Sequence, residues 1–123
     1  RTPRLFTDEI RQTCTAENVA EVMVELCERS DVSGIQHWAG AEPVSRYELG
    51  CRVREHFKLS ETQAPLARVA RADVPELAAR RPGCLKLAVG PLAAKLKTRP
   101  QHLAAQLEEL QVPAPVRAWY LAG

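Results

Sequence analysis

The sequence predicts a mixed α/β domain that is mostly helical, with two or three short strands and no complete doubly wound sheet. Two observations predict the helices: apolar residues recur at helical spacing after Thr15 and again after Ser45. Residues 35–39 and 85–89 are the candidate strands, and each is short. A chain of 123 residues suits one hydrophobic core, so we expect a single domain over residues 1–123.

The first helix is predicted to begin after Thr15, whose hydroxyl can accept a hydrogen bond from an amide of the first turn. Apolar side chains follow at the i, i+3, i+4 and i+7 positions and are expected to face the core. They are Val19, Val22, Met23 and Leu26. Four glutamates share another side of this helix, where we expect a solvated face rather than a metal or catalytic site. They are Glu17, Glu21, Glu25 and Glu28.

After a turn at 30–34, residues 35–39 alternate like a short strand, with His37 beside it and Trp38 in the core. Ser45 and Glu48 have the spacing of a capping box, which predicts a second helix to about residue 59. Its apolar stripe is Leu49, Val53 and Phe57. Tyr47, in the first turn of this helix, is expected to pack rather than to transfer protons.

The second half contains many prolines and is predicted to be more irregular. Residues 60–83 form a connection with one helical turn around 75–79, and residues 85–89 form a strand or a turn. A helix with proline at its first position is expected over 91–96. The last clear helix opens near Pro100 and carries an apolar seam, after which the tail 111–123 docks or frays. The seam is Leu103, Leu107 and Leu110.

The composition excludes several classes of function. The net charge of +2 does not indicate a nucleic-acid partner, although residues 64–100 hold eight Lys or Arg against Asp73 and Glu76. No apolar run is long enough to span a membrane, so we expect a cytoplasmic protein without a membrane partner. The four cysteines and three histidines lack metal-ligand spacing, so we expect free buried thiols and no metal.

Five segments, in this order, resemble the carboxyl-terminal half of an extended short-chain dehydrogenase/reductase, closest to the dTDP-4-dehydrorhamnose reductase branch. They are residues 8–11, 14–20, 34–40, 45–49 and 81–85, which read DEIR, CTAENVA, GIQHWAG, SRYEL and RPGCL. The resemblance covers about residues 5–110. Two positions depart from the family pattern: Cys14 stands where the family prefers Pro, and Asn18 where it prefers Asp.

The resemblance implies a substrate lobe that closes over a sugar nucleotide beside a dinucleotide-binding half. It makes Arg11 and Arg81 the candidate substrate-binding residues, since a guanidinium fork matches a diphosphate with two parallel hydrogen bonds. The alternative for each is a surface charge or an internal clip to a carbonyl oxygen. The family also implies NADP or NAD as cofactor, which a missing amino-terminal half would hold.

Catalysis by this chain alone is not expected. It has no glycine-rich strand-to-helix turn for a dinucleotide pyrophosphate, and Cys51, not a lysine, follows Tyr47 at the fourth position of a Tyr-x-x-x-Lys pair. We therefore expect a fragment, a separate subunit or a degenerate relative. Its partner would be the missing half or a second copy. The alternative is a noncatalytic regulatory subunit, similar to the regulatory beta subunit of methionine adenosyltransferase.

Overall fold

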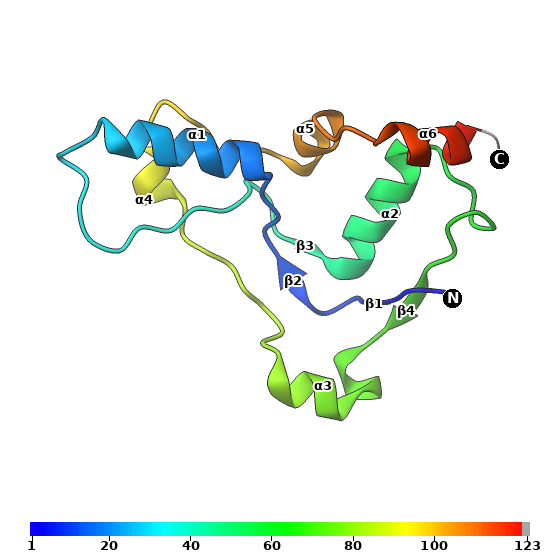
Figure 1. Cartoon of the computed structure of the whole chain (residues 1–123). Coiled ribbons are helices and arrows are strands. Elements are labelled where there is room, and N and C mark those ends of the chain that lie inside the picture. The colour runs from blue at the N-terminus through cyan, green and yellow to red at the C-terminus, as the bar shows by residue number, and fades with distance from the viewer. Residues whose placement is uncertain (122–123) are drawn as a thin grey trace.

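The computed structural model describes residues 1–121, with side chains up to Ala118 (Figure 1). The helices are α1 (Ala16–Cys27), α2 (Arg46–His56), the 3-10 turn η1 (Arg71–Asp73), α3 (Pro75–Arg80), α4 (Gly90–Ala93), α5 (Leu103–Glu108) and α6 (Ala114–Leu121). The strands are β1 (Arg4–Phe6), β2 (Ile10–Arg11), β3 (Val44–Ser45) and β4 (Ala67–Val69). Helices with short strands and no complete sheet confirm the predicted fold class.

Both predicted helix caps are present. The Thr15 hydroxyl accepts a hydrogen bond from the Asn18 amide at 3.2 Å. The Ser45 hydroxyl accepts one from the Glu48 amide at 3.0 Å. The Glu48 carboxylate does not complete a capping box in the predicted way, because it pairs with Arg52 one turn later at 2.8 Å. The caps therefore set where α1 and α2 begin, as the sequence predicted.

The strands form two small sheets. β1 pairs in parallel with β4, and β2 pairs with β3 in antiparallel register, with Ile10 opposite Ser45. Ile10 also makes an isolated bridge to Cys84, which brings residues 82–85 against β2. These pairs place the turn between β1 and β2 at the centre of the molecule, between α2 and the loop that follows α3 (Figure 1).

The predicted strands at 35–39 and 85–89 are wrong. Residues 35–39 form no strand, Ile35 is 90% exposed, and His37 is exposed rather than packed. In the second segment, residues 85–89, the Leu85 amide donates a hydrogen bond to the Ile10 carbonyl, but no strand forms. A strand needs another segment at the right distance to pair with, and alternation within one segment does not supply that segment.

Two separate apolar clusters replace one continuous core. The first joins α1 to α4 and contains Val22, Leu92 and Leu96, with Leu26, Val32 and Trp38 packed against it. The second joins β3, α2 and α5 and contains Val44, Leu103 and Leu107, with Leu49 and Val53 packed against it. Trp38 is thus confirmed as a packing residue. Figure 1 shows α3 apart from both clusters.

Only half of the predicted core face of α1 is buried. Val22 and Leu26 pack inward, but Val19 is 38% and Met23 62% exposed. Val24, on the same side as Met23, is 65% exposed. The side of α1 that carries these residues therefore faces solvent, because α4 is only four residues long and covers one flank of the helix.

Other predicted burials are also corrected. Leu110 is 49% exposed, because α5 ends at Glu108, before the third residue of the expected seam. The four cysteines are free thiols but none is buried: Cys27 and Cys84 are exposed, and Cys14 and Cys51 are half-buried. Three of them, Cys14, Cys27 and Cys84, lie in loops or at a helix end, where a domain with so little core leaves them near the surface.

Asn18 explains one departure from the family pattern. It is 2% exposed, and its side-chain amide donates to the Arg99 carbonyl at 3.1 Å. Its side-chain oxygen accepts from the Trp38 indole at 2.9 Å and from the Cys14 thiol at 3.5 Å. An aspartate would have no proton to donate to Arg99. The two departures, Cys14 and Asn18, are therefore in contact with each other.

No helix within residues 1–121 is both long and apolar enough to cross a membrane.

Candidate functional site

A fully buried carboxylate lies at the centre of the molecule. Glu9 is 0% exposed and follows β1 in the turn to β2. Its Oε2 accepts a hydrogen bond from the Nε of Arg46 at 2.9 Å. The guanidinium groups of Arg11 and Arg71 each approach a Glu9 oxygen to 3.7 Å. One negative charge thus stands among three positive ones, and the cluster, which we call the Glu9 cluster, has a formal excess of positive charge.

Secondary structure brings two of the arginines, Arg46 and Arg71, to Glu9 from distant parts of the sequence, while Arg11 lies two residues after it. Arg11 ends β2, Arg46 is the first residue of α2, and Arg71 begins η1. Hydrogen bonds from the backbone amides of two of these arginines fix their positions. The Arg46 amide donates to the Glu9 carbonyl at 3.1 Å. The Arg71 amide donates to the Asp8 carboxylate at 3.0 Å.

Arg11, a predicted substrate-binding residue, is engaged by the protein itself. Its Nη1 donates to the carbonyls of Ile10 at 2.7 Å and Gly83 at 3.2 Å, and its Nη2 donates to the carbonyl of Pro82 at 3.0 Å. The side chain therefore clips the loop 82–83 to β2, which is the alternative that the sequence left open. Its positive charge still contributes to the field of the Glu9 cluster.

Arg81, the other predicted residue, lies on the same loop but is presented outward. Arg71 holds the Arg81 backbone, because Nη1 of Arg71 donates to the Arg81 carbonyl at 2.6 Å and Nη2 donates to the Ala78 carbonyl at 2.8 Å. The Arg81 side chain is exposed and has no recorded partner within the described residues. The loop is fixed by two arginine clips, and the guanidinium of Arg81 is left for solvent or a ligand.

Arg46 and Arg71 were not identified from the sequence as site residues. Both stand where nothing in their spacing differs from an ordinary surface arginine. The only signal was indirect. Glu9 lies in the short, strand-like first segment of the chain, and a carboxylate that is buried there needs a cationic partner. Arg46 and Arg11 also line a small pocket of about 180 Å³, together with Thr13, Val44, Ser45 and Leu49.

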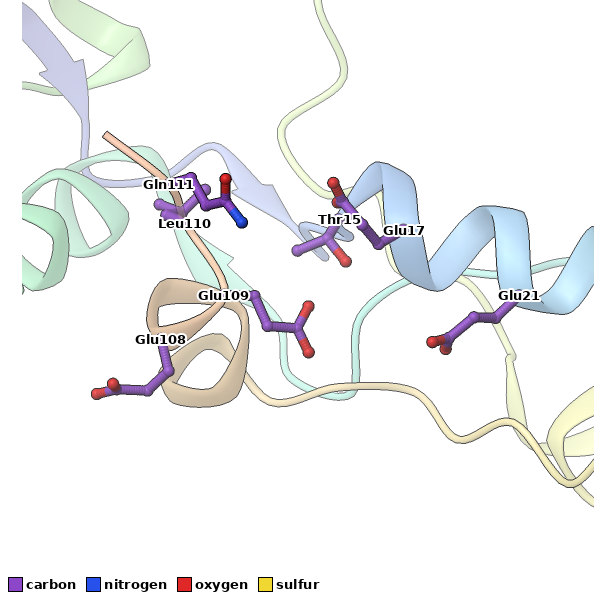
Figure 2. A pocket seen from close by; sticks show the side chains of 7 residues that line it. All are labelled: Thr15, Glu17, Glu21, Glu108, Glu109, Leu110 and Gln111. Atoms are coloured by element: carbon purple, nitrogen blue, oxygen red, sulfur yellow. The ribbon is translucent and has the colours of Figure 1, made fainter. Parts of the chain in front are cut away.

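A larger groove, of about 780 Å³, lies elsewhere between the start of α1 and the end of α5. Figure 2 shows Thr15, Glu17 and Glu21 on the α1 side and residues 108–111 on the α5 side. Four carboxylates and no basic side chain line this acidic groove. Its carboxylates would repel a diphosphate, whereas the smaller pocket at the Glu9 cluster is lined by two arginines.

The described residues contain neither a glycine-rich phosphate turn nor a cluster of metal-ligand side chains. α2 begins directly after β3, but serine and arginine occupy the turn where close approach of a pyrophosphate needs glycine. Gly40, a glycine in a tight position, is packed against the protein: an added Cβ would lie 1.9 Å from the Thr13 carbonyl oxygen. Within residues 1–121, no three His, Cys, Asp or Glu side chains are grouped to hold a metal ion.

The fold is that of a partial α/β domain, mostly helical with few short strands, and the Glu9 cluster is a buried group of charges within it. A family model described as the RmlD substrate binding domain matches residues 2–113, and the chain belongs to this family. The match confirms the resemblance to dTDP-4-dehydrorhamnose reductase and supports a substrate-binding role of the sugar-nucleotide reductase type. No curated protein matches the chain.

Proposed function

We propose that this chain is the substrate-binding half of an NAD(P)-dependent sugar-nucleotide reductase of the dTDP-4-dehydrorhamnose reductase type. It binds the nucleotide sugar and does not catalyse hydride transfer alone. NADP or NAD would be held by a dinucleotide-binding half, in the same polypeptide or a separate one, and the assembly would act in the cytoplasm. The family match over residues 2–113 carries this proposal.

The loop that carries Arg81 and residues 82–83 supplies the means of recognising the nucleotide sugar. Arg81 is exposed on a segment whose backbone is fixed by Arg71, while Arg11 clips the next two residues. A guanidinium on a fixed backbone loses less freedom on binding than one on a mobile loop. Arg81 therefore contacts the diphosphate through its fork, and Arg11 acts by its charge and by holding the loop in place.

The exposed apolar side of α1 supports a partner. Six residues on this side of the helix are exposed, and their helical angles fall within one continuous stripe. They are Ala16, Val19, Ala20, Met23, Val24 and Cys27. An apolar stripe along a whole helix marks an interaction surface rather than an ordinary solvent face. The dinucleotide-binding half is the proposed occupant, and in its absence a second copy of the chain takes its place.

Calorimetry of the chain with a dTDP-sugar and, separately, with NADP tests the ligand. We expect measurable binding of the dTDP-sugar, a loss of about tenfold in affinity for Arg81→Ala, and no binding of NADP. Arg80→Ala, one residue earlier and also exposed, is the matched control and should leave the affinity unchanged. If neither ligand binds, the substrate-binding role fails for the isolated chain, and a noncatalytic regulatory subunit becomes the better explanation.

Light scattering after gel filtration tests the partner surface. The chain alone should self-associate through the α1 stripe, and Met23→Glu should return it to a monomer because a charge would be buried in the contact. Leu77→Glu changes an equally apolar residue, 38% exposed on α3, and should leave self-association intact. A chain that stays monomeric at all concentrations would contradict the partner surface but not the ligand.

A further inference from the structure

We infer that Arg46 is a further anion-contacting residue of this lobe, and that the buried Glu9 positions it for a phosphate-type oxyanion in the small pocket beside Arg11. This inference rests on the proposed function and deepens it. It adds a second phosphate contact to the one assigned to Arg81, from a residue that neither the sequence pattern nor the family match singles out.

The orientation of the Arg46 side chain is the first reason. Its Nε donates to Glu9, and its two terminal nitrogens have no recorded hydrogen bond to any described residue. The side chain is 45% exposed, whereas Glu9 below it is 0% exposed. The guanidinium is thus fixed at its inner edge and open at its outer edge. Its Nη pair is the edge that makes paired contacts with a phosphate.

Comparison with Arg11 gives the second reason. Arg11 lines the same pocket, but its Nη atoms already donate to three backbone carbonyls and its side chain is 21% exposed. It has few protons left to give to a ligand. Arg46, with a free Nη pair at the same pocket, can make the direct contact while Arg11 adds only charge.

The pocket itself suits a small oxyanion. Its volume is about 180 Å³, larger than a single water site and small for a whole nucleotide. Ser45 lies on its wall, and its hydroxyl accepts the Glu48 amide, so its own proton remains available to a ligand oxygen. Val44 and Leu49 form the apolar part of the wall. No acidic side chain lines this pocket, in contrast to the acidic groove.

Glu9 is a positioning residue in this scheme. It is too deeply buried to touch the ligand, and its Oε1 has no hydrogen-bond partner. Its role is to hold the Nε of Arg46, so that the outer edge of the guanidinium faces the pocket. The net positive charge of the cluster is kept, because one carboxylate stands among the three arginines.

Titration of the chain with inorganic pyrophosphate, followed by NMR, tests the inference separately from the proposed function. We expect shifts at Ser45, at the Arg46 Nε–H and at Leu49. Arg46→Gln should weaken binding by about tenfold or more, because hydrogen bonds to a charged group are lost. Arg46→Lys should not restore it, since an ammonium lacks the fork. Arg54→Gln removes one positive charge from the same helix, where it pairs with the exposed Glu61, and should bind like the wild type.

Glu9→Gln, provided its circular dichroism shows a folded chain, should weaken pyrophosphate binding and speed solvent exchange of the Arg46 Nε–H. A purely structural role for Glu9 would not single out that proton. No shift with pyrophosphate, or equal affinities of Arg46→Gln and Arg54→Gln, would overturn the inference even if dTDP-sugars bind. If pyrophosphate binds through Arg46 but dTDP-sugars bind no more tightly than pyrophosphate does, the inference stands and the proposed substrate fails.

Discussion

The Glu9 cluster and the acidic groove both gather charged side chains, but they are built in opposite ways. In the first, one carboxylate at 0% exposure is surrounded by three arginines, and two of them, Arg11 and Arg71, are themselves bonded to backbone carbonyls. In the second, four glutamates line an open groove and two of them, Glu17 and Glu21, are neighbours on one face of α1. The first is part of how the chain folds, and the second is a solvated surface.

The contrast shows what makes a charge cluster informative. The acidic groove is larger than the pocket at the Glu9 cluster, yet its carboxylates make few interactions. Glu109 accepts a hydrogen bond from Gln101 at 2.6 Å, and Glu108 lies 3.8 Å from His56. Removing one of these costs the protein little. The Glu9 cluster joins residues from three parts of the sequence around a buried carboxylate that needs its cationic partners, so the fold depends on these side chains.

Replacing Glu9 should have the largest effect. Glu9→Ala leaves three guanidinium groups facing one another around an empty space, and we expect the free energy of unfolding to fall by about 3–5 kcal/mol, the usual loss when one partner of a buried ion pair is removed. Urea denaturation followed by circular dichroism measures it. Glu48→Ala, which removes a half-exposed carboxylate paired with Arg52, is the control and should cost less than about 1 kcal/mol. Equal losses in the two variants would contradict the distinction between buried and surface charge.

A glutamate on α1 outside the groove should contribute to the acid sensitivity. The amides of Thr98 and Lys97 donate to Glu25 and lower its pKa. A carboxylate whose pKa is lower in the folded chain than in the unfolded chain stabilises the protein at pH values above its unfolded pKa of about 4.3. This contribution is lost as the pH falls below that value. Glu25→Gln should therefore reduce the fall in melting temperature between about pH 5.5 and about pH 3.

Glu28→Gln is the matched control, since Glu28 caps the same helix through its backbone but its exposed carboxylate has no recorded partner among residues 1–121. It should keep the acid dependence of the wild type. If both variants respond alike to pH, the bond from Glu25 to the segment after α4 does not form in solution.

Changes in the acidic groove should have the smallest effect. Glu21 has carboxylates four residues away on both sides, at Glu17 and Glu25, and like charges at this spacing destabilise a helix by about 0.2–0.5 kcal/mol per pair. Glu21→Gln should therefore raise the free energy of unfolding slightly, within about 0.5 kcal/mol. Thermal melting at low and high salt checks this, because screening should remove the gain. A clear destabilisation would show that the groove is structural after all.

The features set by a few neighbouring residues were predictable from the sequence. The caps at Thr15 and Ser45, the two longer helices and the helical turn at 75–80 all depend on local hydrogen bonds and spacing. The strands were not predictable, because β1 finds its partner 63 residues away, with Arg4 opposite Ala67. α6 was missed because prolines 113 and 115 indicate a break, yet proline is also favourable in a first helical turn.

The candidate site also contains some residues that the sequence singled out and others that it did not. The resemblance singled out Arg11 and Arg81, and the structure places both on or against one loop, although whether they bind substrate remains a prediction. Arg46 and Arg71 became visible only when the fold brought them to Glu9. No local pattern distinguishes an arginine that will meet a buried carboxylate from one that faces water, because the carboxylate lies tens of residues away.

The contact between Cys14 and Asn18 couples the two positions chemically. The thiol donates to the Asn18 oxygen while the Asn18 amide donates to Arg99, so the two positions at which this chain departs from its family share one hydrogen-bond network. Changes at contacting positions do not add independently. Restoring aspartate at 18 alone would set a carboxylate against a carbonyl, whatever stands at 14. The Arg99 carbonyl therefore favours an amide over a carboxylate at position 18, and the thiol at position 14 adds a donor to the same amide oxygen.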